Sequence, residues 1–146
     1  MLPLEDALAQ MLNQLPFPTK TETLALTEAA DRVCAEDVIS PINVPSFDNS
    51  AMDGYAVRLA DLQQSMTLSV AGKSFAGNPF QGEWVAQSAV RIMTGAMIPE
   101  GADAVVMQED VTVNEDGTVT FSALPKANQN IRRIGEHVKK GDVLLH

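Results

Sequence analysis

The sequence predicts an α+β protein that is mostly β, with a glycine-bent β lobe and a small α/β lobe that carries an N-terminal helix. Helical periodicity is confined to the start of the chain, where apolar side chains recur every three or four positions. From residue 56 onward, short alternating runs are separated by glycines, which is typical of strands joined by tight bends. We place the small lobe at residues 1–45 with 122–146 and the β lobe at residues 46–121.

The N-terminal segment has the pattern of a short amphipathic helix. Pro3 suits the first turn, and Glu5 and Asp6 suit the positive end of the helix dipole. We expect the helix to end at residues 16–18, where two prolines cannot continue it. Its apolar stripe consists of Leu4, Ala7, Leu8, Met11, Leu12 and Leu15. A chain of this size offers little to cover a stripe so near its terminus, so we expect it to pack on a second subunit.

The next residues predict short elements. Residues 21–26 alternate between polar and apolar like a strand, and Thr27 suits the N-cap of a brief helix over residues 28–33. Cys34 lies between apolar neighbours and has the pattern of a core position. It is the only cysteine in the chain and can form no internal disulfide, so we expect a reducing compartment and a cytoplasmic location.

The β lobe follows from hydrophobic pattern and turn chemistry. Residues 104–107 are apolar throughout, which predicts a strand buried on both faces. Two alternating runs within residues 111–121 flank Asn-Glu-Asp-Gly-Thr, a combination that indicates a β-hairpin. The last apolar run, residues 143–145, needs a partner, and residues 38–39 match it best in composition.

Charge and motif content exclude several classes of protein. The formal net charge of −9 argues against nucleic acid and anionic membranes as general partners, although basic residues gathered at 132–146 leave room for a local anion site. No apolar run approaches the roughly 20 residues that span a bilayer. The sequence contains no P-loop, dinucleotide-binding or nucleophile-elbow motif. His137 has no second histidine or cysteine at ligand spacing, which argues against a zinc site.

Two segments indicate chemistry, and the first lies at residues 44–57. Asp48, Ser50 and Asp53 crowd into a loop that opens into a predicted strand at Gly54. A carboxylate at such a junction can face a polyanionic or metal-bound ligand. The alternative is that these side chains only cap turns, which is the commoner role of a lone aspartate in a loop.

The second segment runs from Arg91 to Glu109. A predicted strand delivers Thr94 to a bend at Gly95, after which a Pro-Glu-Gly turn leads into the buried strand. A hydroxyl beside a glycine lets a ligand oxygen approach both the side chain and the backbone amides. The alternative is an ordinary turn, because Thr-Gly is common where strands end.

These two segments, with a third at residues 130–137, together resemble the N-terminal part of the molybdopterin molybdenumtransferase family, also called the MoeA and gephyrin E-domain family. The motifs that carry the resemblance are Arg-Val-Cys-Ala-Glu-Asp-Val at 32–38, Pro-Ser-Phe-Asp-Asn-Ser-Ala-Met-Asp-Gly-Tyr-Ala at 45–56, Arg-Ile-Met-Thr-Gly-Ala at 91–96, Pro-Glu-Gly-Ala-Asp-Ala-Val-Val at 99–106, and Asn-Ile-Arg with Gly-Glu between 130 and 136. The resemblance runs from residue 24 to the end of the chain.

The resemblance implies an enzyme that inserts molybdenum from molybdate into adenylylated molybdopterin with release of AMP, in molybdenum cofactor biosynthesis. It implies Mg²⁺ as the divalent cation, a homodimer, and contact with molybdopterin adenylyltransferase. Carried over by motif, Asp53 and Thr94 are the expected catalytic residues, and Asp53 the expected metal ligand. Ser50 and Arg91 lie in the same motifs and are the expected cofactor-binding residues.

The family is much longer than this chain. Its molybdopterin-binding and C-terminal domains are absent here, so we expect the fragment alone to be inactive. An alternative reading is a non-catalytic dimerisation or scaffold module, a role for which gephyrin is known. The presence of Asp53 and Thr94 together at loop ends favours the enzyme, because scaffolding requires neither.

Overall fold

The computed structural model describes residues 2–16 and 20–146 and divides the chain into two compact units. The first unit runs to Val38 and includes Leu145–His146, and the second is Ile39–Leu144. The expected helix-ending residues 17 and 18 lie outside the described residues.

The first unit contains the predicted N-terminal helix, α1 (Leu4–Gln14), which begins after Pro3 and ends where Leu15 turns to an extended conformation. None of its residues, all within the described part of the chain, is buried. The apolar stripe is therefore uncovered: Leu4 is 77% exposed, Met11 67% and Leu15 63%.

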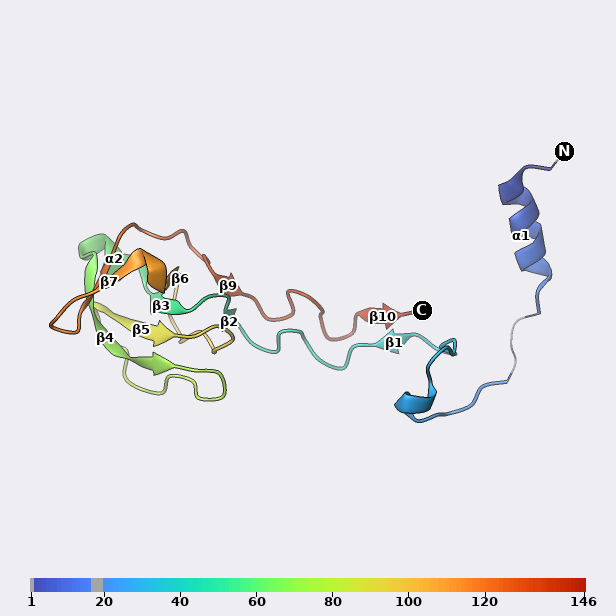
Figure 1. Cartoon of the computed structure of the whole chain (residues 1–146), viewed down its shortest axis with the longest axis horizontal. Helices are drawn as coiled ribbons and strands as arrows, with labels where there is room; N and C mark the ends of the chain where they lie inside the picture. Colours follow the sequence, from blue (N-terminus) through green and yellow to red (C-terminus); the bar gives the residue numbers. More distant parts are fainter. Residues whose placement is uncertain (1, 17–19) are drawn as a thin grey trace. The chain divides into compact units, whose positions relative to one another are not determined.

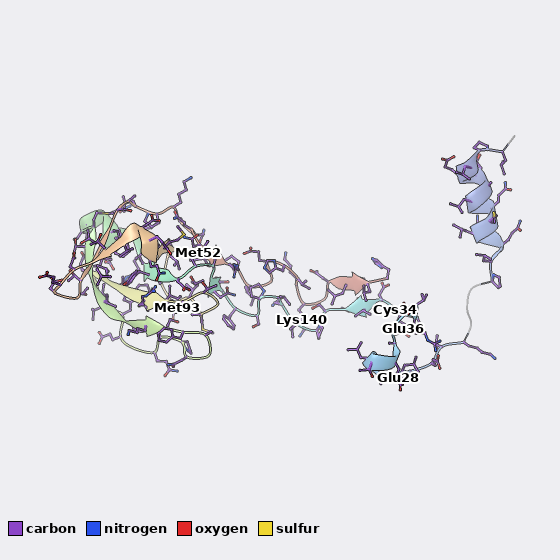
Figure 2. The ribbon with its side chains drawn as sticks, viewed as in Figure 1. Glu28, Cys34, Glu36, Met52, Met93 and Lys140 are labelled. Carbon is purple, nitrogen blue, oxygen red and sulfur yellow. The ribbon has the colours of Figure 1, made fainter. Side chains whose placement is uncertain are left out.

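Three predictions for the rest of this unit are wrong. Residues 21–26 form no strand, and in place of a helix over residues 28–33 there is only the 3₁₀ turn η1 (Leu26–Glu28). A strand needs a hydrogen-bonded neighbour, and the described residues provide none here. Cys34 is exposed, because no packed layer covers it (Figure 2).

The second unit is built on a six-stranded sheet in the order β6–β3–β5–β4–β8–β7 (Figure 1). All neighbouring strands are antiparallel except β4 and β5, which are parallel with an irregularity between Val70 and Gly72. The strands are β3 (Gly54–Val57), β4 (Thr67–Ser74), β5 (Ser88–Ile92), β6 (Ala104–Met107), β7 (Val111–Val113) and β8 (Val119–Phe121). The predicted mostly-β class and the hairpin are confirmed.

The sheet packs apolar side chains on both faces. Side chains alternate along a strand, so Tyr55 and Val57 enter one core cluster while Ala56 enters another. The short helix α2 (Leu59–Gln64), which the sequence did not predict, covers the first cluster with Leu62. Ala104, Val105 and Val106 of β6 are all buried, as the continuous apolar run predicts.

Two segments of the second unit run side by side away from the sheet (Figure 1). We call residues 39–50 and 131–144 the arm. Within it β2 (Asn49–Ser50) pairs with β9 (Ile131–Arg132), and Val44 bridges to Val138. At the far end β1 (Val38–Ile39) pairs with β10 (Val143–Leu145), which confirms the predicted pairing of these two runs.

Candidate functional site

Asp53 and Thr94, which the sequence analysis singled out separately, bind each other. Oδ1 of Asp53 accepts two hydrogen bonds of 2.7 Å, one from the backbone N–H of Thr94 and one from its hydroxyl. Asp53 lies just before β3 and Thr94 just after β5, and these antiparallel neighbours bring the two loop ends together. Met52 and Met93, which directly precede these two residues, mark the site in Figure 2.

Close backbone approach fixes the start of β3. A Cβ added at Gly54 would lie 1.9 Å from the carbonyl oxygen of Val106, so no other residue fits there. Gly95 takes a left-handed conformation with φ of 79°, which favours glycine and turns the chain directly after Thr94. Its N–H donates to the carbonyl of Ser50 at 2.9 Å, which ties the two loops together.

Hydrogen bonds keep the carboxylate of Asp53 ionised. The backbone N–H of Thr94 lowers the pKa of Asp53 most, its hydroxyl lowers it further, and the charge of Arg91 adds a smaller effect in the same direction. Asp53 is half-buried, so its charge faces solvent on one side. Among the described residues, its second oxygen, Oδ2, accepts no hydrogen bond, which leaves it open to a ligand.

Arg91 lies beside this pair but is largely engaged by the protein itself. Its Nη1 donates to the carbonyl of Gly54 at 2.7 Å, and its Nη2 donates to Oε1 of Gln108 at 2.5 Å. Its guanidinium also stacks over the ring of Tyr55, 5.2 Å from the centroid. Arg91 therefore contributes positive charge and backbone support to the site.

Ser50 is placed within the same loop, but its side chain is buried. Its hydroxyl donates to the carbonyl of Met52 at 2.6 Å and accepts from the N–H of the same residue at 3.3 Å. Its N–H donates to the carbonyl of Ala96 at 3.0 Å. The structure thus brings Asp53, Thr94 and Arg91 together at the surface, with Ser50 beneath them holding the turn.

The donor set constrains which ligands fit. In the described ranges 2–16 and 20–146, no three His, Cys, Asp or Glu side chains gather as a metal-binding cluster. Mg²⁺ needs no such cluster, because it keeps several waters and takes one or two carboxylates plus substrate phosphate oxygens. The open Oδ2 of an ionised Asp53 fits that requirement. Thr94 has committed its proton to Asp53, so its hydroxyl oxygen is left as an acceptor.

Sequence reasoning missed Gln108 and underrated Asp48. Gln108 directly follows β6, and a polar residue at the end of a buried strand was the available signal. Asp48 was counted among turn residues, yet it accepts from the N–H of Ile134 at 2.7 Å and forms an ion pair with Arg133 across the arm.

A hollow of about 620 Å³ lies in the first unit, lined by residues between Lys20 and Ala35 that include Arg32 and Cys34. Every predicted site residue lies in the second unit instead. The candidate site described above, at Asp53 and Thr94, lies where two loop ends converge. No helix among the described residues is long and apolar enough to cross a membrane.

The fold and the site define a class: a β-rich module that presents an ionised carboxylate and a threonine from two adjoining loop ends. Residues 2–146 match the family described as the MoeA N-terminal region, domains I and II. The chain belongs to this family, and the resemblance inferred from its motifs is confirmed.

The names of similar proteins match this family. The chain is 80% identical to a molybdopterin molybdenumtransferase of Haemophilus influenzae over 145 residues, which cover 99% of this chain and 36% of that protein. It is 41% identical to the protein of that name in Bacillus subtilis over 86% of this chain and 31% of the relative. A crystal structure of a molybdopterin biosynthesis MoeA protein from Pyrococcus horikoshii superposes with a TM-score of 0.77 at 37% identity, covering 100% of this chain and 39% of that one. The chain thus spans about a third of the length of these relatives.

Proposed function

We propose that this chain is the N-terminal part of an enzyme of molybdenum cofactor biosynthesis, which inserts molybdenum from molybdate into adenylylated molybdopterin with release of AMP. The names of its relatives support the pathway. One observation carries the placement of the site: the carboxylate of Asp53 is held ionised by Thr94, with its second oxygen open.

Asp53 is the residue that would hold Mg²⁺. A hydrated cation there would offset the negative charge of the adenylate phosphate as AMP leaves. Asp53 itself contributes a fixed negative charge in one orientation, because both its hydrogen bonds come from the same residue. Preorganisation of this kind avoids the cost of reorienting the carboxylate during the reaction.

Thr94 would contact the substrate through its hydroxyl oxygen. Since its proton points to Asp53, this oxygen accepts hydrogen bonds and does not donate them. A phosphate oxygen is also an acceptor, so it could not form a hydrogen bond with the hydroxyl oxygen of Thr94. The N–H groups of the pterin or a cation-bound water are the better match, so we assign Thr94 to one of these.

Arg91 and Ser50 complete the binding face in different ways. The guanidinium of Arg91 adds positive charge beside Asp53, which favours an anionic cofactor precursor. The buried hydroxyl of Ser50 holds the turn over Met52, so we assign its contribution to cofactor binding to the shape of the loop.

We further propose a homodimer, with the dimer contact on the lobe formed by residues 1–45 and 122–146, and molybdopterin adenylyltransferase as a second partner that supplies the adenylylated substrate. The uncovered apolar stripe of α1 supports the homodimer. A cytoplasmic location suits both partners.

The test uses a chimera, because the relatives are longer than this chain. The 145 matching residues of the Haemophilus relative are replaced by this chain, and molybdenum insertion into adenylylated molybdopterin is measured with Mg²⁺ present. Asp53→Asn keeps the shape but removes the charge. We expect insertion to fall by about tenfold or more, which corresponds to ~1.4 kcal/mol or more of lost transition-state stabilisation.

Asp116→Asn is a matched control. Oδ1 of Asp116 also accepts from the N–H and hydroxyl of a single threonine, Thr118, at 2.9 and 2.7 Å, but in the β7–β8 turn. We expect near-normal insertion from this variant. If Asp53→Asn instead lowers the melting temperature and leaves insertion per folded molecule near normal, Asp53 only caps a turn and does not belong to the site.

A further inference from the structure

The backbone carbonyls of Asp53 and Gly54, where the chain enters β3, each accept a hydrogen bond from a neighbouring strand or the residue that follows it. The backbone N–H of Gln108 donates to the carbonyl of Asp53 at 3.0 Å. Nη1 of Arg91 donates to the carbonyl of the next residue, Gly54, at 2.7 Å. Two successive carbonyls are therefore fixed by residues from two different neighbouring strands, because Arg91 lies in β5 and Gln108 follows β6.

Gln108 and Arg91 are also bonded to each other. Nη2 of Arg91 donates to Oε1 of Gln108 at 2.5 Å, and Nε2 of Gln108 reaches a carboxylate oxygen of Glu109 at 3.4 Å. This orientation of the amide is the one that chemistry requires, since a guanidinium only donates and a carboxylate only accepts. The contacts close a ring that runs through Asp53, Gly54, Arg91 and Gln108.

We propose that Gln108 is a positioning residue, whose side chain holds Arg91 on the Gly54 carbonyl and so keeps the Asp53 carboxylate aligned on Thr94. The backbone bond from Gln108 to Asp53 survives any substitution, whereas the side-chain bond to Arg91 does not. Losing it frees one end of the guanidinium and lets the Asp53–Gly54 peptide tilt. The catalytic consequence rests on the proposed function, but the structural consequence does not.

The charged and titratable groups that the structure records around this ring are few. Asp53 and Arg91 belong to it, Tyr55 lies under the guanidinium, and Glu109 is reached by the amide of Gln108. Gln108→Met keeps the length of the side chain and adds no charge, so the ionic surroundings of Asp53 change only through Arg91. Gln108→Glu keeps an acceptor for Arg91 and serves as the conservative variant.

Amide hydrogen exchange in this chain is the primary test. The Thr94 amide is protected through its bond to Asp53, and we expect its exchange to become about tenfold faster in Gln108→Met, equivalent to ~1.4 kcal/mol. Gln108→Glu should retain most of the protection. Gln63→Met is the matched control, because among the described residues the Gln63 side chain makes no hydrogen bond and it lies on α2.

If Gln108 only stabilised the fold, amide exchange would show a different pattern. Gln108→Met would then accelerate exchange across β3, β5 and β6 together and lower the melting temperature, and Gln108→Glu would not rescue Thr94. That outcome, or unchanged exchange of the Thr94 amide in Gln108→Met, overturns the proposal.

Activity of the chimera separates this inference from the proposed function. We expect Gln108→Met to lower kcat severalfold with little change in KM, because the substrate still binds while the carboxylate is misaligned. A chimera that is inactive before any substitution would count against the proposed function alone. Normal kcat with loosened Thr94 would remove Gln108 from catalysis and overturn the catalytic part of the proposal.

Discussion

At the scale of single residues, the same pair of hydrogen bonds, from the N–H and hydroxyl of a threonine to one aspartate oxygen, occurs at two places among the described residues. One pair is local in sequence and the other connects distant loops. Asp116 and Thr118 form the local pair within one turn, where only Gly117 separates them and the bonds only shape the hairpin. Asp53 and Thr94 form the other pair between two loops whose positions depend on the pairing of β3 with β5. The Asp53–Thr94 pair is therefore sensitive to the arrangement of the sheet, whereas the Asp116–Thr118 pair is not.

Thr94→Val tests how the carboxylate is held. The variant loses the hydroxyl but keeps the backbone N–H, which lowers the pKa of Asp53 most, so we expect this pKa to rise only part of the way to its ordinary value. The measurement is a carboxyl-carbon NMR titration of both proteins. In the native chain the pKa is depressed by folding, so the stabilisation is present above the ordinary pKa and is lost as pH falls through the depressed one.

An unchanged titration curve in Thr94→Val would contradict this account of the hydroxyl. Asp116 provides the internal reference in the same spectra, because its pKa is lowered by Thr118 and should not respond to a change at residue 94.

How much of the site was predictable follows from these contacts. Asp53 and Thr94 stand out because each is a polar residue at the end of a predicted strand beside a glycine, which is a local pattern. Their mutual bonds, the burial of Ser50 and the grip of Gln108 on Arg91 depend on which strands are neighbours. Sequence patterns give strand positions but not strand order, so these features could not be predicted from the sequence.

At the scale of elements, the arm is held by side chains as much as by strand pairing. Asn43 accepts from the N–H of Lys140 at 2.8 Å, and Asp48 accepts from the N–H of Ile134 and from Arg133. Only short stretches of the arm pair as regular strands, so these bonds connect the two segments where the ladder is interrupted.

Asp48→Ala is expected to destabilise the second unit by about 1–2 kcal/mol, because it removes the acceptor for Ile134 together with the partner of Arg133. Urea denaturation at neutral pH measures the loss, with Glu115→Ala in the exposed β7–β8 turn as control. The N–H of Ile134 lowers the pKa of Asp48 most, with a further contribution from Arg133. The native advantage should therefore disappear as pH falls through that lowered pKa.

An equal loss in the control, or a difference that persists at a pH well below that of Asp48 ionisation, would count against this role. The remaining stabilisation would then come from packing that does not depend on the charge.

The elements also show where sequence analysis succeeds. The β7–β8 hairpin and helix α1 were predicted because their signals are contained in adjacent residues. The parallel pairing of β4 with β5 and the short helix α2 were not, since one depends on a connection of thirteen residues between Ser74 and Ser88 and the other has too few turns to show a period. Long-range pairing and short helices are decided by packing.

At the scale of the whole molecule, α1 carries an apolar stripe in which no residue is buried by the part of the chain that the structure describes. We expect light scattering at micromolar concentration to give the mass of a dimer. The double substitution Leu8→Glu with Leu12→Glu should give a monomer, because both leucines, 54% and 58% exposed, lie on the stripe. Leu26→Glu, at a residue 92% exposed in η1, is the control and should leave the mass unchanged.

A monomeric mass for the unsubstituted chain would refute the homodimer for this chain. A dimer that survives both glutamates would place the contact elsewhere in the molecule.

The arm affects how the sheet can be moved between proteins by engineering. Asn49 and Arg132 are directly opposite partners in β2 and β9. The segment that contains the six-stranded sheet therefore begins and ends at adjacent positions. A segment with adjoining ends behaves as a cassette: it can be inserted into a surface loop of a host, or removed from one, without stretching either chain. Residues 49–132 meet that condition, which makes them a transplantable module that carries Asp53, Thr94 and Gln108 together.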